Sequence, residues 1–88
     1  MMTAEDEFAQ HGEVSILKAD GAGYALCTRA YQPRSGDEVY VRSRDGMQWP
    51  VRVAKDHRGV PNIRFASKTV PLIYDSKRQL WVVRELLG

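Results

Sequence analysis

Few residues of this chain could catalyse a reaction or bind a metal. The sequence has two histidines, His11 and His57, and one cysteine, Cys27. Metal sites need several such ligands at characteristic spacings, and the separations of these three residues match none of them. Cys27 lies in an alternating apolar stretch, which is typical of a buried, unreactive thiol. We therefore expect neither a metal nor a cofactor.

The carboxylates and glycines do not form a catalytic pattern either. General acid–base catalysis needs paired carboxylates, or an oriented histidine, in a pocket. The acids of this chain fall in turns or in the N-terminal stretch. Gly21 and Gly23 lack the third glycine and the following helix of a dinucleotide-binding loop. We predict that the protein is not an enzyme and that it acts by binding.

Basic residues and aromatic rings alternate in the middle of the chain. The net charge is +2, but residues 1–20 carry five acids and one base, so the remainder is basic. Open barrels bind single-stranded nucleic acid by stacking bases on rings while Arg and Lys contact phosphates. We predict nucleic acid, or alternatively an acidic protein surface, as the partner, although solvated strand faces would give the same pattern. The candidate contact residues are Tyr40, Arg42, Arg44, Arg52, Lys55, Arg58 and Arg64.

The end of the chain suggests an alternative function. Residues 70–86 are apolar on both faces of a predicted hairpin, and Tyr, Trp and Arg are the residue types of interface hot spots. Core filling would explain the same residues. The sequence therefore leaves open a protein–protein interaction module, such as a stoichiometric inhibitor or an accessory subunit of phage or plasmid type, and a homodimer through residues 70–86. The candidate interface residues are Tyr74, Arg78, Trp81 and Arg84.

Short strands must position these residues. Apolar, β-branched and aromatic residues occur in short runs bounded by Gly, Pro, Asp, Asn and Ser. The runs predict strands at 13–18, 24–31, 38–44, 47–55, 62–67, 70–74 and 79–86. We expect residues 1–12 to form an acidic tail or a short helix that ends by Gly12, and residues 13–88 to form one domain.

So many short strands in so small a chain must curl to cover one face of their sheet. The predicted fold is therefore mostly β, a small antiparallel, half-open barrel of five to seven strands, SH3-like or OB-like.

One hairpin can be predicted at the level of register. A three-residue loop at 44–46, with Gly46 in the left-handed conformation, pairs Val41 with Trp49, Val39 with Val51 and Ser43 with Met47. This register sorts apolar residues onto one face, so Trp49, like Phe65, is expected to point inward. Pro50 indicates an edge strand or a bulge. The opposite face then holds Tyr40, Arg42, Gln48, Pro50 and Arg52.

The stretch 36–53 carries a pattern that resembles a known family. Gly-Asp-Glu-Val-Tyr-Val at 36–41 is followed by Asp-Gly at 45–46 and by Trp49 at the start of a second strand. This pattern resembles SH3-like barrels of the Tudor type. The resemblance implies a binding module for nucleic acid, modified tails or proteins. No methyl-lysine cage is expected, because the register puts Tyr40 and Trp49 on opposite faces.

Cysteine content and the N-terminal residues bear on the compartment. A single cysteine cannot form a disulfide within the chain. The first residues are acidic rather than cationic and apolar, and no run approaches the roughly 18 apolar residues of a membrane span. We expect a cytoplasmic protein without membrane contact.

Overall fold

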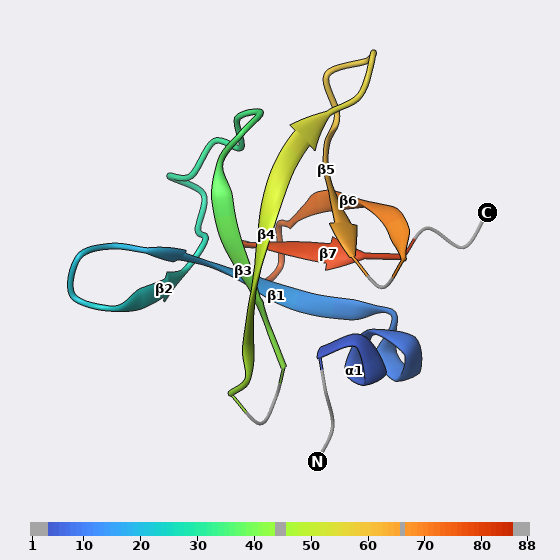
Figure 1. Ribbon diagram of the computed structural model, residues 1–88. Helices are drawn as coiled ribbons and strands as arrows, with labels where there is room; N and C mark the ends of the chain where they lie inside the picture. The colour runs from blue at the N-terminus through green and yellow to red at the C-terminus, as the bar shows by residue number, and fades with distance from the viewer. Residues whose placement is uncertain (1–3, 44–45, 66, 86–88) are drawn as a thin grey trace.

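A computed structural model describes residues 4–43, 46–65 and 67–85. One helix and seven strands follow one another in the chain (Figure 1). They are α1 (Ala4–His11), β1 (Glu13–Ala19), β2 (Tyr24–Leu26), β3 (Glu38–Arg42), β4 (Gln48–Lys55), β5 (Pro61–Phe65), β6 (Lys68–Asp75) and β7 (Leu80–Arg84). The predicted strands are therefore present in the predicted order.

Six of the strands form a closed antiparallel barrel, and β2 is added to it. The sheet order is β2-β1-β3-β4-β5-β6-β7, and β1 also pairs with β7. The pairs Glu13–Arg84 and Val14–Val83 join the first and last strands, so the barrel is closed where the sequence suggested a half-open one. The predicted small antiparallel β-barrel with a short N-terminal helix is confirmed.

Strand β1 pairs with three other strands. One edge pairs with β3, while the other pairs first with β7 and then with β2. Cys27 joins these neighbours, because its N–H donates to Ile16 O (3.0 Å) and its C=O accepts from Trp81 N (2.8 Å). The predicted strand 24–31 therefore ends at Leu26, where the chain turns toward β7.

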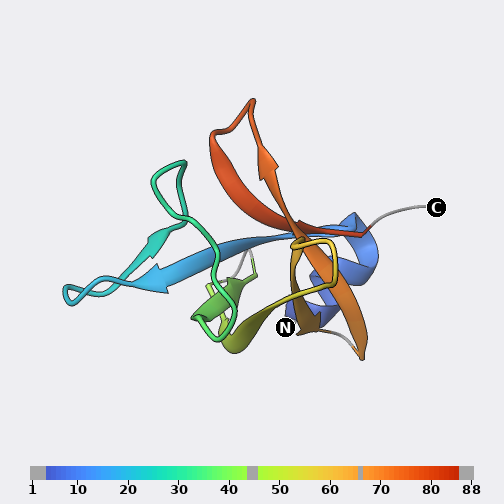
Figure 2. The same ribbon diagram turned by 90° about the horizontal axis from the view of Figure 1, so that it is seen from above.

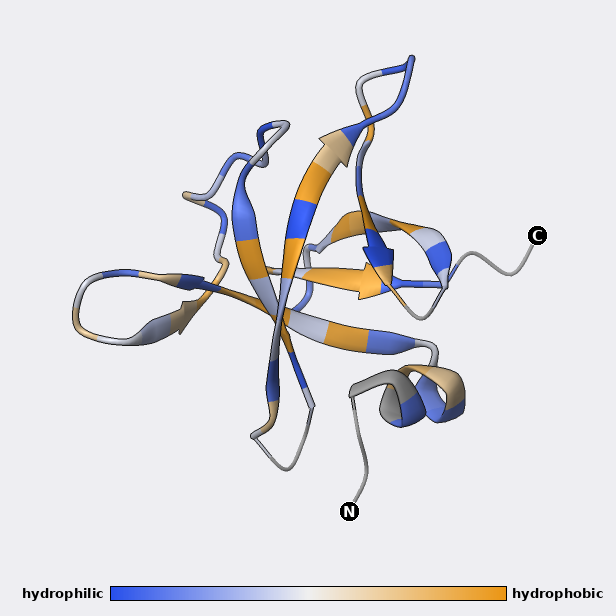
Figure 3. Ribbon diagram, in the orientation of Figure 1, coloured by the Kyte–Doolittle hydropathy of each residue, from blue (hydrophilic) through white to orange (hydrophobic). Residues whose placement is uncertain are grey.

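The β3–β4 hairpin has the predicted register. Val41 pairs with Trp49 and Val39 with Val51. Ser43 N–H donates to Met47 O (3.0 Å), and Gly46 has the expected left-handed φ of 88°. Residues 44 and 45 of the predicted loop lie outside the described residues. Figure 3 shows hydrophobic and hydrophilic residues alternating along β4, as a strand with one buried face requires.

Pro50 marks an edge, as predicted. Val53 N–H donates to Asp37 O (2.8 Å) on the β3 side. Backbone groups alternate in direction along an antiparallel strand, so those of Pro50 point away from β3. Strand β5 pairs with β4 only from Val53 to Lys55. The segment 48–52 thus has a free edge, and Pro50 presents no N–H there.

Inward side chains of all six barrel strands form the core. Ile16, Val39, Val41 and Ile63 are completely buried, and Phe65 is 4% exposed, as predicted. Trp49 is on the inward side of β4, as predicted, but it is 38% exposed rather than part of the core. Strand β5 does not extend far enough along β4 to cover it.

Helix α1 lies beside the start of β1 (Figure 1). Phe8 is 2% exposed and packs edge-to-face on Phe65, with ring centroids 5.6 Å apart. The helix ends at Gly12, which has a φ of 70° and whose N–H donates to Phe8 O (2.7 Å). An eight-residue helix is marginal in isolation, so the docking of Phe8 into the core stabilises it.

Strands β6 and β7 lie within the sheet rather than at an edge of it. Strand β6 pairs with β5 and β7, and β7 pairs with β6 and β1. Val82 and Val83 point to opposite faces, and both are completely buried. Val83 belongs to the core cluster, and Val82 is equally buried on the opposite face, so the hairpin is apolar on both faces because both are covered there.

Candidate nucleic-acid interface

A row of apolar side chains crosses four strands on the outside of the barrel. Residues directly opposite each other in antiparallel strands share a face. Leu17 on β1 pairs with Leu26 on β2 and with Tyr40 on β3, and Tyr40 pairs with Pro50 on β4. Leu17 is only 2% exposed although it is on the outer face, whereas Leu26 is 38% exposed. The row therefore presents accessible apolar surface at its ends.

Two tyrosine rings meet on this row. The rings of Tyr24 and Tyr40 pack edge-to-face, with centroids 4.8 Å apart, and Tyr24 is 50% exposed. The Tyr40 hydroxyl donates to Glu38 Oε1 (3.0 Å). This hydrogen bond raises the pKa of Tyr40 to about 12, so the phenol stays neutral near pH 7. The pair offers a neutral aromatic surface, and Tyr24 is its more accessible half.

Arg42 and Arg52 flank Tyr40 on the same face. Arg42 is two residues from Tyr40 on β3, and Arg52 is two residues from Pro50 on β4, so these side chains point to the same face. Across the two strands, Arg42 pairs with Gln48 and Arg52 with Glu38. Within the part of the chain that the structure describes, neither guanidinium makes a hydrogen bond or an ion pair. Both side chains are exposed. We call this surface the tyrosine–arginine face; it consists of Tyr24, Leu26, Tyr40, Arg42, Pro50 and Arg52.

The other predicted contact residues lie elsewhere, and Arg44 falls outside the described residues. Arg64 is exposed on β5, and Lys55 ends β4. Arg58 lies in the turn at the far end of the β4–β5 hairpin, which projects from the barrel (Figure 1). The Asp56 carboxylate holds this turn, because it accepts the N–H groups of Arg58 (2.8 Å) and Val60 (3.0 Å). The structure therefore brings only Tyr40, Arg42 and Arg52 of the predicted set together on one face.

The aromatic residues of the predicted protein interface make contacts within the chain. Tyr74 and Trp81 pack edge-to-face with centroids 5.6 Å apart. Trp81 also packs against the core, and its indole N–H donates to Tyr31 O (3.0 Å). These contacts give Trp81 a structural role, and its role in binding a partner stays a prediction.

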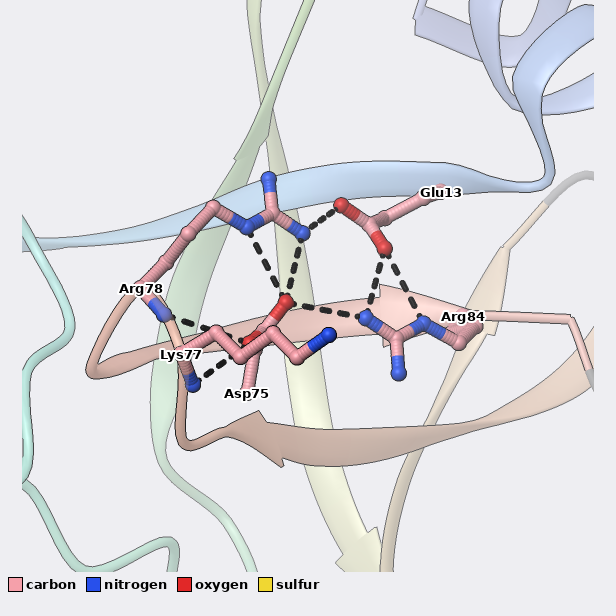
Figure 4. A network of polar contacts seen from close by, with 5 residues as sticks. All are labelled: Glu13, Asp75, Lys77, Arg78 and Arg84. Carbon is pink, nitrogen blue, oxygen red and sulfur yellow. Dashed lines mark hydrogen bonds and ion pairs between the residues drawn. The ribbon is translucent and has the colours of Figure 1, made fainter.

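The two arginines of that predicted interface belong to an ion-pair network (Figure 4). Arg84 donates through Nε and Nη2 to Glu13 Oε2 (3.0 and 2.8 Å) and through Nη2 to Asp75 Oδ2 (3.1 Å). Arg78 contacts Glu13 Oε1 and Asp75 Oδ2, the latter at 2.9 Å. The network joins β1 to β6, to β7 and to the turn between those two strands, at the pairing that closes the barrel. We call this region the β1–β7 seam.

The carboxylates of the seam titrate below their ordinary range. Hydrogen bonds from the backbone and side chain of Arg78 lower the pKa of Asp75 to about 2. Partial burial alone would raise the pKa of Glu13, but the hydrogen bonds from Arg78 and Arg84 outweigh it, and its pKa is lowered. Both acids therefore remain ionised and paired in the folded protein at neutral pH.

A thiol and a groove are further polar features of the described residues. Cys27 is buried, and burial raises the pKa of its thiol to about 11, so it is not a thiolate near neutral pH. A groove of about 290 Å³ is lined by Lys18, Tyr31 and Asp37, among others. Its carboxylate is engaged, because the Tyr31 hydroxyl donates to Asp37 Oδ2 (2.9 Å) and so does the N–H of Arg34 (3.1 Å).

The described residues contain neither a cluster of metal ligands nor a helix that could span a membrane. No three or more His, Cys, Asp or Glu side chains within 4–43, 46–65 and 67–85 are grouped as a metal would require. Helix α1 is the one helix in these ranges, and it is too short and too polar to cross a membrane.

The sequence reasoning missed Tyr24. The signal was the turn at 20–23, which pairs Ala19 with Tyr24 and so puts that ring on the outer face. Comparison of the chain with protein-family models, with curated proteins and with solved structures gives no match.

Proposed function

We propose that this chain is a non-catalytic module that binds single-stranded nucleic acid on the tyrosine–arginine face. The observation that carries the proposal is an exposed tyrosine pair between two arginines that have no partner among the described residues. Bases stack on aromatic rings, and arginines contact the phosphates on either side of them. Unpaired bases are required, because the faces of paired bases are covered by their neighbours in a duplex.

The strand arrangement supports the same proposal. Small antiparallel barrels bind single strands across the outer face of a few adjacent strands, and β2, β1, β3 and β4 form such a face here. The 36–53 hairpin resembles SH3-like barrels of the Tudor type, a class of binding modules. We propose an SH3-like identity for this barrel on that resemblance.

The first test is fluorescence anisotropy of labelled single-stranded and double-stranded oligonucleotides at two salt concentrations. The double variant Arg42→Ala/Arg52→Ala should bind single strands more weakly than the wild type. Each phosphate contact to a single strand contributes about 0.7 to the slope of log affinity against log salt, so losing two contacts should reduce the slope by about 1.4. Tyr24→Ala should weaken binding at both salt concentrations alike, because stacking is not ionic.

The matched control is Arg34→Ala/Lys77→Ala, which removes the same charge from two exposed side chains outside the face. Equal weakening in both double variants would show that net charge, and not this face, is responsible. If no oligonucleotide binds at low salt, nucleic acid is excluded as the partner. A protein partner, on this face or on that of Tyr74 and Trp81, would then be the function to test.

A further inference from the structure

Strand β2 has one edge that no strand of the described residues covers. Among those strands it pairs only with β1, and all three of its residues are exposed. Two backbone hydrogen bonds show which residues of β2 direct their backbone groups to β1. Cys27 N–H donates to Ile16 O and Asp20 N–H donates to Gly23 O, both at 3.0 Å, and the direction alternates from residue to residue between them. Ala25 therefore directs its backbone groups to β1. Tyr24 and Leu26 direct theirs to the free edge, where no described residue meets them.

The free edge of β2 and the free edge of β4 differ in their protection. On β4, Pro50 presents no N–H, and its neighbours along that edge are the polar Gln48 and Arg52. Proline and charge are the usual devices that stop one edge strand from adding to another. Strand β2 has neither device, since it reads Tyr-Ala-Leu. Figures 1 and 2 both show the β1–β2 hairpin projecting away from the barrel, so this edge is accessible.

We propose that two copies of the chain associate through antiparallel pairing of their β2 strands about a two-fold axis at Ala25. In this register Tyr24 is opposite Leu26 of the second copy, and Leu26 is opposite its Tyr24. These are the residues whose N–H and C=O groups face outward, so both pairs exchange backbone hydrogen bonds. Their side chains, 50% and 38% exposed in one copy, also meet on a common face.

Charge favours a second copy as the occupant of this edge. Strand β2 itself carries no charge, so two copies do not repel each other along it. Asp20 precedes the strand and Arg29 follows it, and both side chains are exposed. Antiparallel pairing puts the start of each β2, which Asp20 precedes along the chain, beside the end of the other, which Arg29 follows. A strongly charged peptide of either sign would meet one of these ends unfavourably.

The homodimer through residues 70–86 that the sequence left open stays a prediction. Strand β6 pairs with β5 only from Lys68 to Pro71 and with β7 only from Leu72 to Asp75, so each of its edges is partly covered by another strand. Pairing at β2 also places two tyrosine–arginine faces on one continuous sheet.

Hydrogen exchange of the wild-type protein tests the β2 pairing without any substitution. Exchange of the Tyr24 and Leu26 amides should slow as the protein concentration rises from about 10 μM to about 1 mM. The Ala25 amide, which faces β1, is the internal control and should not respond. Exchange at Tyr24 and Leu26 that is independent of concentration over this range overturns the proposal.

Mass in solution gives the second readout, and it does not depend on nucleic-acid binding. Light scattering of the wild type should approach twice the 10.0 kDa of one chain at high concentration. Leu26→Lys should keep the protein monomeric, because it places like charges on the paired edge. Val60→Lys, at another exposed apolar residue, should leave the dimer intact. A Leu26→Lys protein that is folded and still dimeric overturns the β2 pairing, and if the variant does not fold, the exchange measurement decides.

Discussion

The β1–β7 seam and the tyrosine–arginine face both carry two arginines, but the surroundings of these arginines differ. Arg78 and Arg84 contact Glu13 and Asp75, so their charge is neutralised within the chain. Arg42 and Arg52 make no ion pair within the described residues. A basic residue count therefore does not locate a binding surface. The arginines that a ligand can use are those whose charge the fold leaves unpaired.

The aromatic residues of the two regions differ in the same way. Trp81 at the seam packs against the core and has its indole N–H bonded to Tyr31 O. Tyr24 on the face is half exposed and packs on a single ring. The aromatic ring at the seam thus supports the closed barrel, whereas the face leaves an aromatic ring accessible.

The largest expected effect on stability is at Trp81, the aromatic residue at the seam. Trp81→Ala should lower the free energy of unfolding by about 3 kcal/mol, because it removes a large side chain packed on the core together with one hydrogen bond. Tyr24→Ala, on the face, should cost about 1 kcal/mol or less. Urea unfolding followed by circular dichroism would measure both. A Trp81→Ala protein of unchanged stability that has lost a partner would reverse the assignment of the two regions.

Arg84→Ala should have the next largest effect. It removes contacts to both Glu13 and Asp75, and at a partly exposed site this should cost about 1 kcal/mol. The cost should shrink in high salt, which screens exposed charges. The same urea experiment at two salt concentrations measures it. A cost that does not depend on salt would mean that the arginine stem, and not its charge, stabilises the seam.

Acid should weaken the seam before it affects the face. The folded pKa of Asp75, about 2, lies below the ordinary value of 3.8. A carboxylate with a depressed folded pKa stabilises the fold fully above its unfolded pKa, and this contribution is lost as pH falls through the folded pKa. Stability should therefore decline between about pH 4 and about pH 2, and less steeply in Asp75→Asn. Equal slopes for wild type and variant would show that the decline arises at other carboxylates, such as Asp37 or Asp56, whose pKa values are also lowered.

The smallest effect on stability is expected on the face. Arg42→Ala/Arg52→Ala should change the free energy of unfolding by no more than about 0.5 kcal/mol, because both side chains are exposed and unpaired within the described chain. Thermal unfolding would detect a larger change. A large loss of stability would show that these arginines support the hairpin, and a loss of binding could then not be assigned to contact with a ligand.

Strand positions and the β3–β4 register could be predicted because they depend on local patterns. Alternation of period two marks each strand, and a glycine with a left-handed conformation sets the loop length at Gly46. Register then put Tyr40, Arg42 and Arg52 on one face without any long-range information. This is the part of the candidate site that was predicted.

The rest depends on contacts between residues far apart in the chain. Nothing near Glu13 indicates that Arg78 and Arg84 will neutralise it, because the three meet only when the barrel closes. The exposure of Trp49 depends on where β5 stops pairing with β4, which alternation along β4 does not reveal. The turn at 20–23 puts Tyr24 on the outer face, but its ring meets that of Tyr40 because β2 and β3 both pair with β1.

The pairing of β1 with β7 also determines when the fold can be completed. Val14 is one of the first barrel residues to be synthesised, and its partner Val83 is one of the last. Hairpins such as β3–β4 can form as soon as their own residues are available, whereas the barrel cannot close until β7 has been made. Contacts of such long sequence separation slow folding, because the loop entropy is lost before the contacts stabilise the chain. During that interval Val14 and Ile16 have no β7 beside them, so closure of the barrel is the step that removes β1 from contact with other unfolded chains.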